Sequence, residues 1–164
     1  MLTQSELKEY LSYDKDTGIF TWIKKTNNRS NRIFIGKIAG HYVDNYIRIG
    51  IFKKEYLAHQ LAWLYVNGIF PNSNIDHIDG NKSNNSIDNL RICNQSQNQQ
   101  NRKTSNKNNK LNLMGVCLDG RSKKYIATIT LNRKQIWLGS FDTPELAHTA
   151  YLNEKRMIHN FNTL

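Results

Sequence analysis

Hydrophobic and polar residues alternate in two different patterns along this chain, one on each side of a polar stretch near residue 105. In the first part, Thr3 followed by Glu6 forms a capping-box signal for a short helix with Leu7, Tyr10 and Leu11 on its apolar face. Further elements are expected as strands over 19–23, 36–43 and 46–52 and a helix over about 55–67, ended by Gly68. The first part is therefore expected to be a mixture of short strands and helices.

A strand, loop, strand and helix are expected next. Apolar Ile75 and Ile78 precede a turn-rich loop over 79–86, and Leu90 and Ile92 alternate with polar residues. Asn94 is a suitable N-cap for a helix running to about residue 103.

The last part of the chain predicts three strands and one helix. The strands cover 115–118, 125–131 and 135–138, and the helix begins after Thr143 with Pro144 at its first position and ends near residue 159. The apolar residues of this helix fall close to one side: Leu146, Ala147, Ala150, Tyr151 and Met157. We therefore expect one face of a small antiparallel sheet to be covered and the other to be free.

The polar stretch 103–110 has almost no apolar side chain, so we expect it to be a linker. It divides the chain into domains expected at 1–102 and 114–164, with a basic linker over 103–113. The predicted fold class is α+β, with an N-terminal ββα unit and supporting strands and helices, followed by a three-stranded sheet packed on one helix.

Positive charge favours a polyanionic partner. The sequence has 23 Lys and Arg against 13 Asp and Glu, a formal net charge of +10. Eight of these cations fall between residues 103 and 134 with Asp119 as the one acid, so the local balance is 8 − 1 = +7. We expect the eight to contact DNA phosphates: Lys103, Lys107, Lys110, Arg121, Lys123, Lys124, Arg133 and Lys134.

Candidate chemistry gathers in the segment 76–98. His77 can take a proton near neutral pH, while Asp76 and Asn98 offer hard oxygens that suit Mg²⁺ or Mn²⁺. Asn89 could orient the imidazole by accepting its other N–H. Phosphodiester hydrolysis needs such a base and such a cation. Neighbours on a regular strand point to opposite faces, so Asp76 and His77 converge only if the strand ends or bulges there.

This segment resembles the HNH endonucleases of the phage and intron homing type, whose ββα-metal unit is also called a His-Me finger. The resemblance implies one divalent cation held by Asp76 and Asn98, His77 as general base and Asn89 as the central Asn that orients it, with products that carry 5′ phosphate and 3′ hydroxyl. His59 resembles a His that precedes the motif in many of these nucleases, and we expect it to be structural. Asp79 either approaches the cation through water or shapes the turn with Gly80 and Asn81.

Residues 114–161 resemble the plant ethylene-response-factor (Apetala-type) DNA-binding domain, in motifs such as Trp137-Leu138-Gly139. The resemblance implies that the free sheet face lies in the major groove and that its outward residues are Cys117, Asp119, Thr128, Thr130, Gln135 and Trp137. That family has several Arg at such positions, whereas this chain has smaller, neutral groups at most of them. Core packing is the alternative for Trp137.

Other motifs bound the remaining possibilities. Cys93 and Cys117 lack partners at zinc-ligand spacing, and neither a signal peptide nor an apolar run long enough to cross a bilayer is evident. We therefore expect a phage-encoded, cytoplasmic monomer that acts on double-stranded DNA, without structural zinc, small-molecule cofactor or membrane. A homing or nicking endonuclease is the leading hypothesis; a catalytically silent DNA-binding regulator and a nonspecific nuclease are the alternatives.

Overall fold

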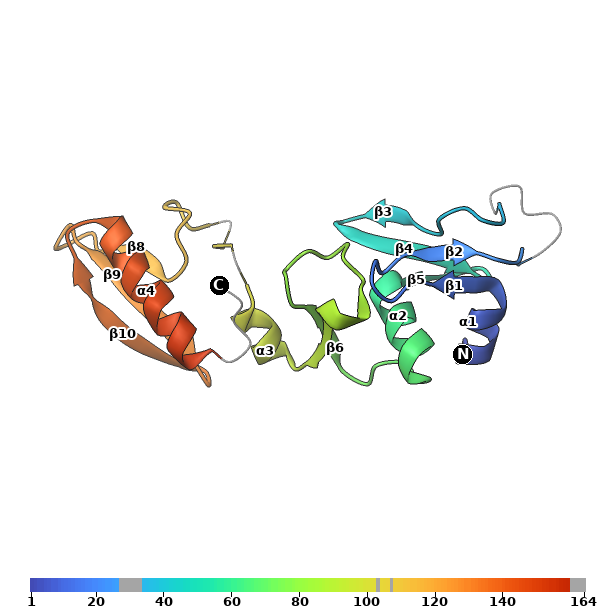
Figure 1. Cartoon of the computed structure of the whole chain (residues 1–164). Coiled ribbons are helices and arrows are strands. Elements are labelled where there is room, and N and C mark those ends of the chain that lie inside the picture. Colours follow the sequence, from blue (N-terminus) through green and yellow to red (C-terminus); the bar gives the residue numbers. More distant parts are fainter. Residues whose placement is uncertain (27–33, 103, 107, 160–164) are drawn as a thin grey trace. The chain divides into compact units, whose positions relative to one another are not determined.

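The computed structural model describes residues 1–26, 34–102, 104–106 and 108–159, and the chain forms two compact units, 1–94 and 95–164 (Figure 1). The division lies eight residues before the expected domain end at residue 102, since α3 (Gln95–Gln100) groups with the second unit.

The N-terminal helix begins as the capping signal predicts. Helix α1 spans Gln4–Tyr10, the Glu6 N–H donates to Thr3 Oγ1 at 3.2 Å, and the Thr3 N–H donates to Glu6 Oε2 at 2.8 Å. Strand β1 (Leu11–Tyr13) follows directly and pairs antiparallel with β2 (Phe20–Trp22). The capping-box prediction is confirmed because two reciprocal bonds satisfy N–H groups that a helix start leaves without partners.

Three antiparallel strands form the second sheet of this unit, in the order β3 (His41–Val43), β4 (Tyr46–Ile51) and β5 (Lys54–Leu57). Helix α2 covers Ala58–Asn67, so the expected helix start near residue 55 is wrong. Residues 55–57 instead pair with β4, because Phe52 and Lys53 take left-handed conformations that turn the chain back into a hairpin. Gly68 ends α2 at φ 80°, as expected.

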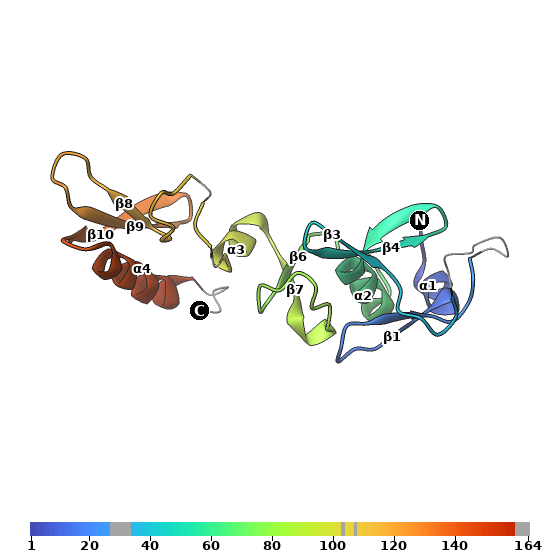
Figure 2. The ribbon, with the colours of Figure 1, turned by 90° about the horizontal axis from the view of Figure 1, so that it is seen from above.

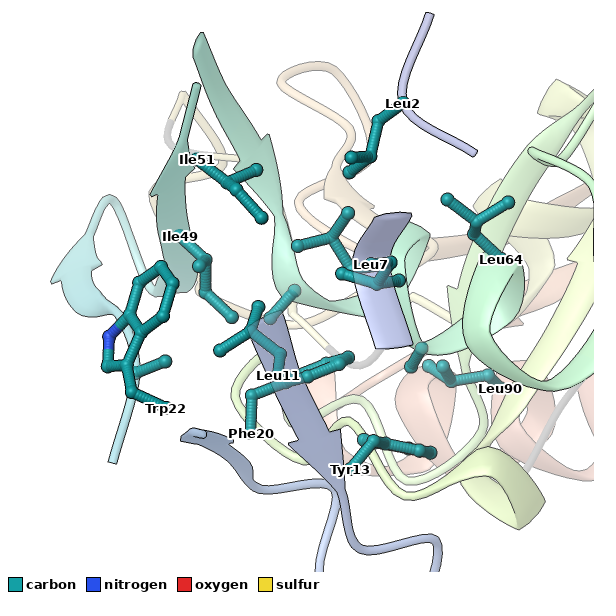
Figure 3. Close-up of a cluster of buried hydrophobic side chains, with 14 residues drawn as sticks. Leu2, Leu7, Leu11, Tyr13, Phe20, Trp22, Ile49, Ile51, Leu64 and Leu90 are labelled. Atoms are coloured by element: carbon teal, nitrogen blue, oxygen red, sulfur yellow. The ribbon is translucent and has the colours of Figure 1, made fainter. Parts of the chain in front are cut away.

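Apolar side chains from α1, α2 and the two sheets fill one core (Figure 3). Leu7, Leu11, Ile49 and Leu61 are each 0 % exposed. Leu90 joins the same cluster. Since Leu90 belongs to the third sheet of the unit, the core holds the candidate site against the rest of the fold.

That third sheet is a two-stranded ribbon of β6 (Asn74–His77) and β7 (Leu90–Cys93). A loop and the short 3-10 helix Ile87–Asn89 connect the strands. Strand, loop, strand and helix α3 thus follow one another in the expected order.

In the second unit, β9 (Tyr125–Leu131) is the central strand between β8 (Val116–Leu118) and β10 (Lys134–Phe141). Helix α4 (Pro144–Ile158) lies along one face of this sheet (Figures 1 and 2), and Thr143 caps it by accepting from the Leu146 N–H. Three strands and one helix are present as the sequence pattern predicts.

The inward face of α4 differs from the expectation. Leu146 and Met157 are 55 % and 76 % exposed, whereas Lys155 is 1 % exposed. The Lys155 ammonium donates to the Arg102 carbonyl, so the apolar part of this long side chain is buried while its charged end has a polar partner.

The expected linker is partly folded onto the second unit. Leu111 and Leu113 pack against the core of Val116, Ala127 and Ala147. The Asn109 amide donates to the carbonyls of Leu113 and Val116, at 2.6 and 3.3 Å. The last residues of the linker therefore belong to the folded sheet domain.

None of the helices within the described ranges combines the length and the apolar character needed to span a bilayer.

Candidate active site

His77 is the last residue of β6 and its side chain is 5 % exposed. Its ring meets the His59 ring of α2 edge to face, with centroids 5.0 Å apart at 88°, and the Tyr46 ring at 6.3 Å. Leu90 lies opposite His77 in the ribbon and belongs to the core. The imidazole is therefore held between a helix and a strand of the first unit.

An amide oxygen fixes the tautomer of His77. Asn85 Oδ1 lies 3.3 Å from His77 Nε2, and the Asn85 side-chain nitrogen donates to the Ser83 carbonyl at 3.1 Å, which sets the orientation of the amide. Because an amide oxygen only accepts, Nε2 carries the proton. In the neutral ring, Nδ1 then holds the lone pair that a general base needs.

Burial keeps this ring neutral. Desolvation lowers the pKa of His77 below its usual value, and the Asn85 hydrogen bond and the Asp79 and Asp76 carboxylates oppose the shift without reversing it. His77 is accordingly a proton acceptor at neutral pH.

The N-terminal hairpin holds Asn85 in place. Asn85 is 0 % exposed, and its carbonyl accepts from the Tyr13 hydroxyl at 2.7 Å. Burial raises the pKa of Tyr13, so this hydroxyl stays a donor. Gly18, at φ 71°, approaches so closely that a Cβ there would lie 2.3 Å from the Asn85 carbonyl carbon. The turn over 14–18 thus buttresses the residue that orients His77.

We expected Asn89 to orient the His77 ring. Its side-chain amide instead makes hydrogen bonds to the loop that follows His77. Its oxygen accepts from the Asp79 N–H at 2.9 Å, and its nitrogen donates to Asp79 Oδ1 at 3.0 Å and to the Asn84 carbonyl at 2.8 Å. The Asn89 carbonyl also accepts from the Ile78 N–H at 2.9 Å. Asn89 therefore fixes the loop directly after His77.

Asp79 organises the same loop. Its Oδ1 accepts from the Asn81 N–H at 2.7 Å, and its Oδ2 accepts from the Asn84 amide at 2.7 Å. Partial burial would raise the pKa of Asp79, but the hydrogen bonds from Asn84, Asn81 and Asn89 outweigh it and lower the pKa. These contacts are those of the turn-shaping alternative.

Asp76 forms an ion pair with its cross-strand neighbour Arg91. Arg91 Nε and Nη2 lie 2.9 and 2.8 Å from Asp76 Oδ2, and Asp76 is 5 % exposed. Asp76 and His77 pair with Arg91 and Leu90 in regular register, so their side chains leave the ribbon on opposite faces. The end of β6 at His77, rather than a bulge, is what could let both reach one phosphate.

Asn98 lies on α3, exposed, in the second unit. Joint ligation of a cation with Asp76 therefore remains a prediction. The donor chemistry fits a hard cation, because Mg²⁺ is commonly bound by one or two carboxylates and completed by water and phosphate oxygens. Within the described residues no three His, Cys, Asp or Glu side chains gather as a metal site, so amide, water and substrate oxygens would complete the set.

Comparison with known proteins decides the family. Residues 56–100 match the family model described as HNH endonuclease. The chain is 32 % identical to Protein 3.8 of Escherichia phage T7 over 111 residues, 67 % of this chain and 91 % of that protein. This chain belongs to the protein 3.8 family and carries an HNH endonuclease domain. No solved structure matches it significantly.

The matched HNH residues span α2, the β6–β7 ribbon and α3, and thus include His59, His77, Asn89 and Asn98. HNH nucleases generally use divalent metal ions, and a nuclease domain implies a DNA substrate. The contact that the sequence pattern missed is Asn85 with His77: the pair Asn84-Asn85 lay within the loop, but nothing local distinguished one Asn from the other.

His59 of the HNH domain gives a stability prediction. Burial lowers its pKa from 6.5 to about 4, with the neighbouring His77 adding to the shift. The unfolded chain binds a proton there between these values while the folded chain does not, so stability should fall as the pH drops from 6.5 to about 4. We expect the unfolding free energy of His59→Gln to change less with pH than that of the wild type, by about 2–3 kcal/mol between pH 6.5 and about 4. Urea unfolding at pH 7.0 and 4.5 measures it; equal slopes in both proteins would contradict the assignment.

The second unit has one sheet face covered by α4 and one exposed. Ala127 and Ile129 of β9 are buried, so Thr128 and Thr130 lie on the opposite face. Trp137 pairs with Thr128 and is 66 % exposed, which excludes the core alternative for this residue. The Gln135 amide donates to Thr128 Oγ1 at 3.1 Å.

The basic residues of this unit lie mostly in its turns. Arg121, Lys123 and Lys124 follow β8, and Arg133 and Lys134 lie at the β9–β10 hairpin; these five and Lys110 are all exposed. Lys103 and Lys107 lie outside the described residues. The Asp119 carboxylate accepts from the Arg121 and Ser122 N–H groups, both at 3.2 Å, and so closes the turn after β8.

Proposed function

We propose that this protein is a divalent-metal-dependent DNA endonuclease of the homing or nicking type. The observation that carries the proposal is His77, a neutral imidazole held by Asn85 through Nε2 inside a matched HNH domain. A buried ring with its proton directed to an amide presents Nδ1 as the base.

In the proposed reaction, His77 Nδ1 takes a proton from the water that attacks the scissile phosphate. Asn85 stabilises the imidazolium that results, because Asn85 Oδ1 accepts from the Nε2 proton. Loop contacts from Asn89 and Asp79 keep the end of β6 in place while the charge on the ring changes.

Asp76 and Asn98 would hold the cation, Mg²⁺ or Mn²⁺, one per active site. When bound, such an ion stabilises the charge that develops on the phosphate and on the leaving 3′ oxygen. Arg91 holds Asp76 Oδ2 and so orients the carboxylate that would bind the ion. Products with 5′ phosphate and 3′ hydroxyl would result.

The second unit would hold the duplex in the manner of the ethylene-response-factor domains it resembles. Thr128, Thr130, Gln135 and Trp137 would face the major groove, and the basic residues of the turns would contact phosphates. The groove-facing side chains are neutral, so base selection would depend on few hydrogen bonds.

Mapping both strands of phage or host DNA after incubation with Mg²⁺ tests the proposal against its alternatives. Cuts at one or a few sites would support a homing or nicking enzyme, and scattered cuts a nonspecific nuclease. Binding without any cut would support a regulator.

Asn85→Ala should slow cleavage by up to about 10², because small misplacement of a catalytic group costs that much. DNA affinity should stay unchanged, since Asn85 contacts Nε2 of the His77 ring and not Nδ1, the nitrogen proposed as the base. Single-turnover cleavage with saturating enzyme measures the effect, and Asn74→Ala, an exposed change on the same strand, is the control. Wild-type rates for Asn85→Ala would refute the orienting role.

A further inference from the structure

A cavity of about 630 Å³ lies within the second unit. The residues that line it come from helix α3, from positions 102, 104–106 and 109, from the end of β9, and from Tyr151 of α4 and His159 directly after it. Its volume lies within the roughly 300–1,000 Å³ typical of small-molecule sites and exceeds what a phosphate ion alone would fill.

One buried group in the cavity wall lacks a partner among the described residues. His159 is 9 % exposed, and its Nε2 lies 3.1 Å from the Thr130 carbonyl, which can only accept. Nε2 therefore carries the proton in the neutral ring, and Nδ1 is an acceptor without a hydrogen bond. A buried acceptor left without a donor is costly, so this position favours a ligand that supplies one.

The charged side chains among the described residues of the lining are positive. Arg102 and Arg133 border the cavity, and within the described part of the chain no Asp or Glu lines it. Arg102 Nη1 donates to Asn106 Oδ1 and Nη2 donates to the Ser105 carbonyl, which holds the guanidinium in place. The Lys155 ammonium donates to the Arg102 carbonyl and so fixes the backbone of Arg102. A guanidinium group in a fixed position, as at Arg102, suits a phosphate.

The rest of the lining suits a nucleoside. Side-chain amides and hydroxyls from α3 and the following segment supply donors and acceptors of the kind that base edges and sugar hydroxyls require. The Tyr151 ring closes one wall, packed so tightly against Gly115 that a Cβ there would lie 1.9 Å from it. An aromatic wall, amides and two cations match the three parts of one nucleotide.

We propose that this cavity binds a single nucleotide, with its phosphate on Arg102 and Arg133 and a base amino or sugar hydroxyl group donating to His159 Nδ1. The nucleotide is either free or part of an unpaired strand. The proposal rests on the proposed function only in taking nucleic acid as the source of such a strand.

Titration of the full-length protein in EDTA tests the proposal, since cleavage then plays no part. The probes are 5′-dAMP and an eight-nucleotide single strand, and amide NMR shifts of Gly115, Thr130 and Tyr151 report on the cavity. We expect shifts at these residues with at least one probe. Shifts with both probes or with dAMP alone identify a free nucleotide as sufficient, and shifts with the oligonucleotide alone identify a strand.

Two variants locate the binding. Arg133→Asn removes the cation and keeps a residue that tolerates the left-handed turn at φ 66°, and His159→Gln keeps a donor for Thr130. Each should weaken binding by about 10- to 100-fold. The controls Arg156→Ala on α4 and His41→Gln on β3 change the same residue types outside the cavity and should bind as wild type.

No shift with either probe, or wild-type affinity in both cavity variants, would overturn the proposal. Duplex cleavage in Mg²⁺ is measured on the same proteins. Loss of cleavage with nucleotide binding intact would refute the endonuclease alone, and the reverse would refute the nucleotide site alone.

Discussion

His77→Ala should slow DNA cleavage by about 10² to 10⁴, the usual contribution of a positioned general base. The ring contributes its lone pair at Nδ1, and Asn85 and the loop contacts only orient it. DNA binding should persist, because the proposed phosphate contacts lie largely in the second unit. Single-turnover rates on supercoiled plasmid, at protein concentrations above the binding constant, separate the chemical step from binding.

His41→Ala is the matched control for this experiment. His41 is exposed on β3 of the same unit and has no proposed role, so its removal should leave the rate unchanged. Wild-type cleavage by His77→Ala would refute the assignment of the base. An equal loss in both variants would show that the effect is on folding.

Gly18→Ala should have the largest effect on stability. At φ 71° an L side chain costs about 1–2 kcal/mol, and crowding adds about 1–3 kcal/mol because the added carbon meets backbone atoms of Asn85 and Ser86, both 2.3 Å away. Relief requires the loop that carries Asn85 to move, so cleavage should fall together with the unfolding free energy. Urea unfolding and single-turnover cleavage measure the two effects.

Gly36→Ala separates the two contributions to this cost. Gly36 has a similar φ of 82°, but no atom of the described residues lies within 4 Å of the Cβ position. It should show only the cost of the left-handed backbone and normal cleavage. Equal destabilisation in the two variants would mean that the contact between the turn and Asn85 carries no energy.

Local signals predicted most of the secondary structure. Three helix ends depend only on neighbours within a few residues, so the sequence alone predicts them: the capping box at Thr3, the left-handed Gly68 and the Thr143-Pro144 helix start. Residues 54–57 were expected in a helix in part and form β5 instead, because pairing with β4 overrides helix propensity.

Long-range contacts account for what the sequence did not reveal. The motif predicted His77 as the candidate base but did not predict its contact with Asn85. The position of Asn85 depends on Tyr13 and Gly18, about seventy residues earlier. Likewise, Lys155 is buried because the Arg102 carbonyl receives its ammonium, while the apolar Leu146 and Met157 remain exposed. Hydrophobic periodicity cannot anticipate such a partner.

The most direct test of the central claim is nicking of supercoiled DNA by the wild-type protein, in Mg²⁺ and in EDTA, followed by analysis of the new ends. We expect nicked or linear DNA with 5′-phosphate and 3′-hydroxyl ends in Mg²⁺ and intact DNA in EDTA. DNA that is bound but never cut, with Mg²⁺ and with Mn²⁺, would contradict the claim that this HNH domain is an active nuclease.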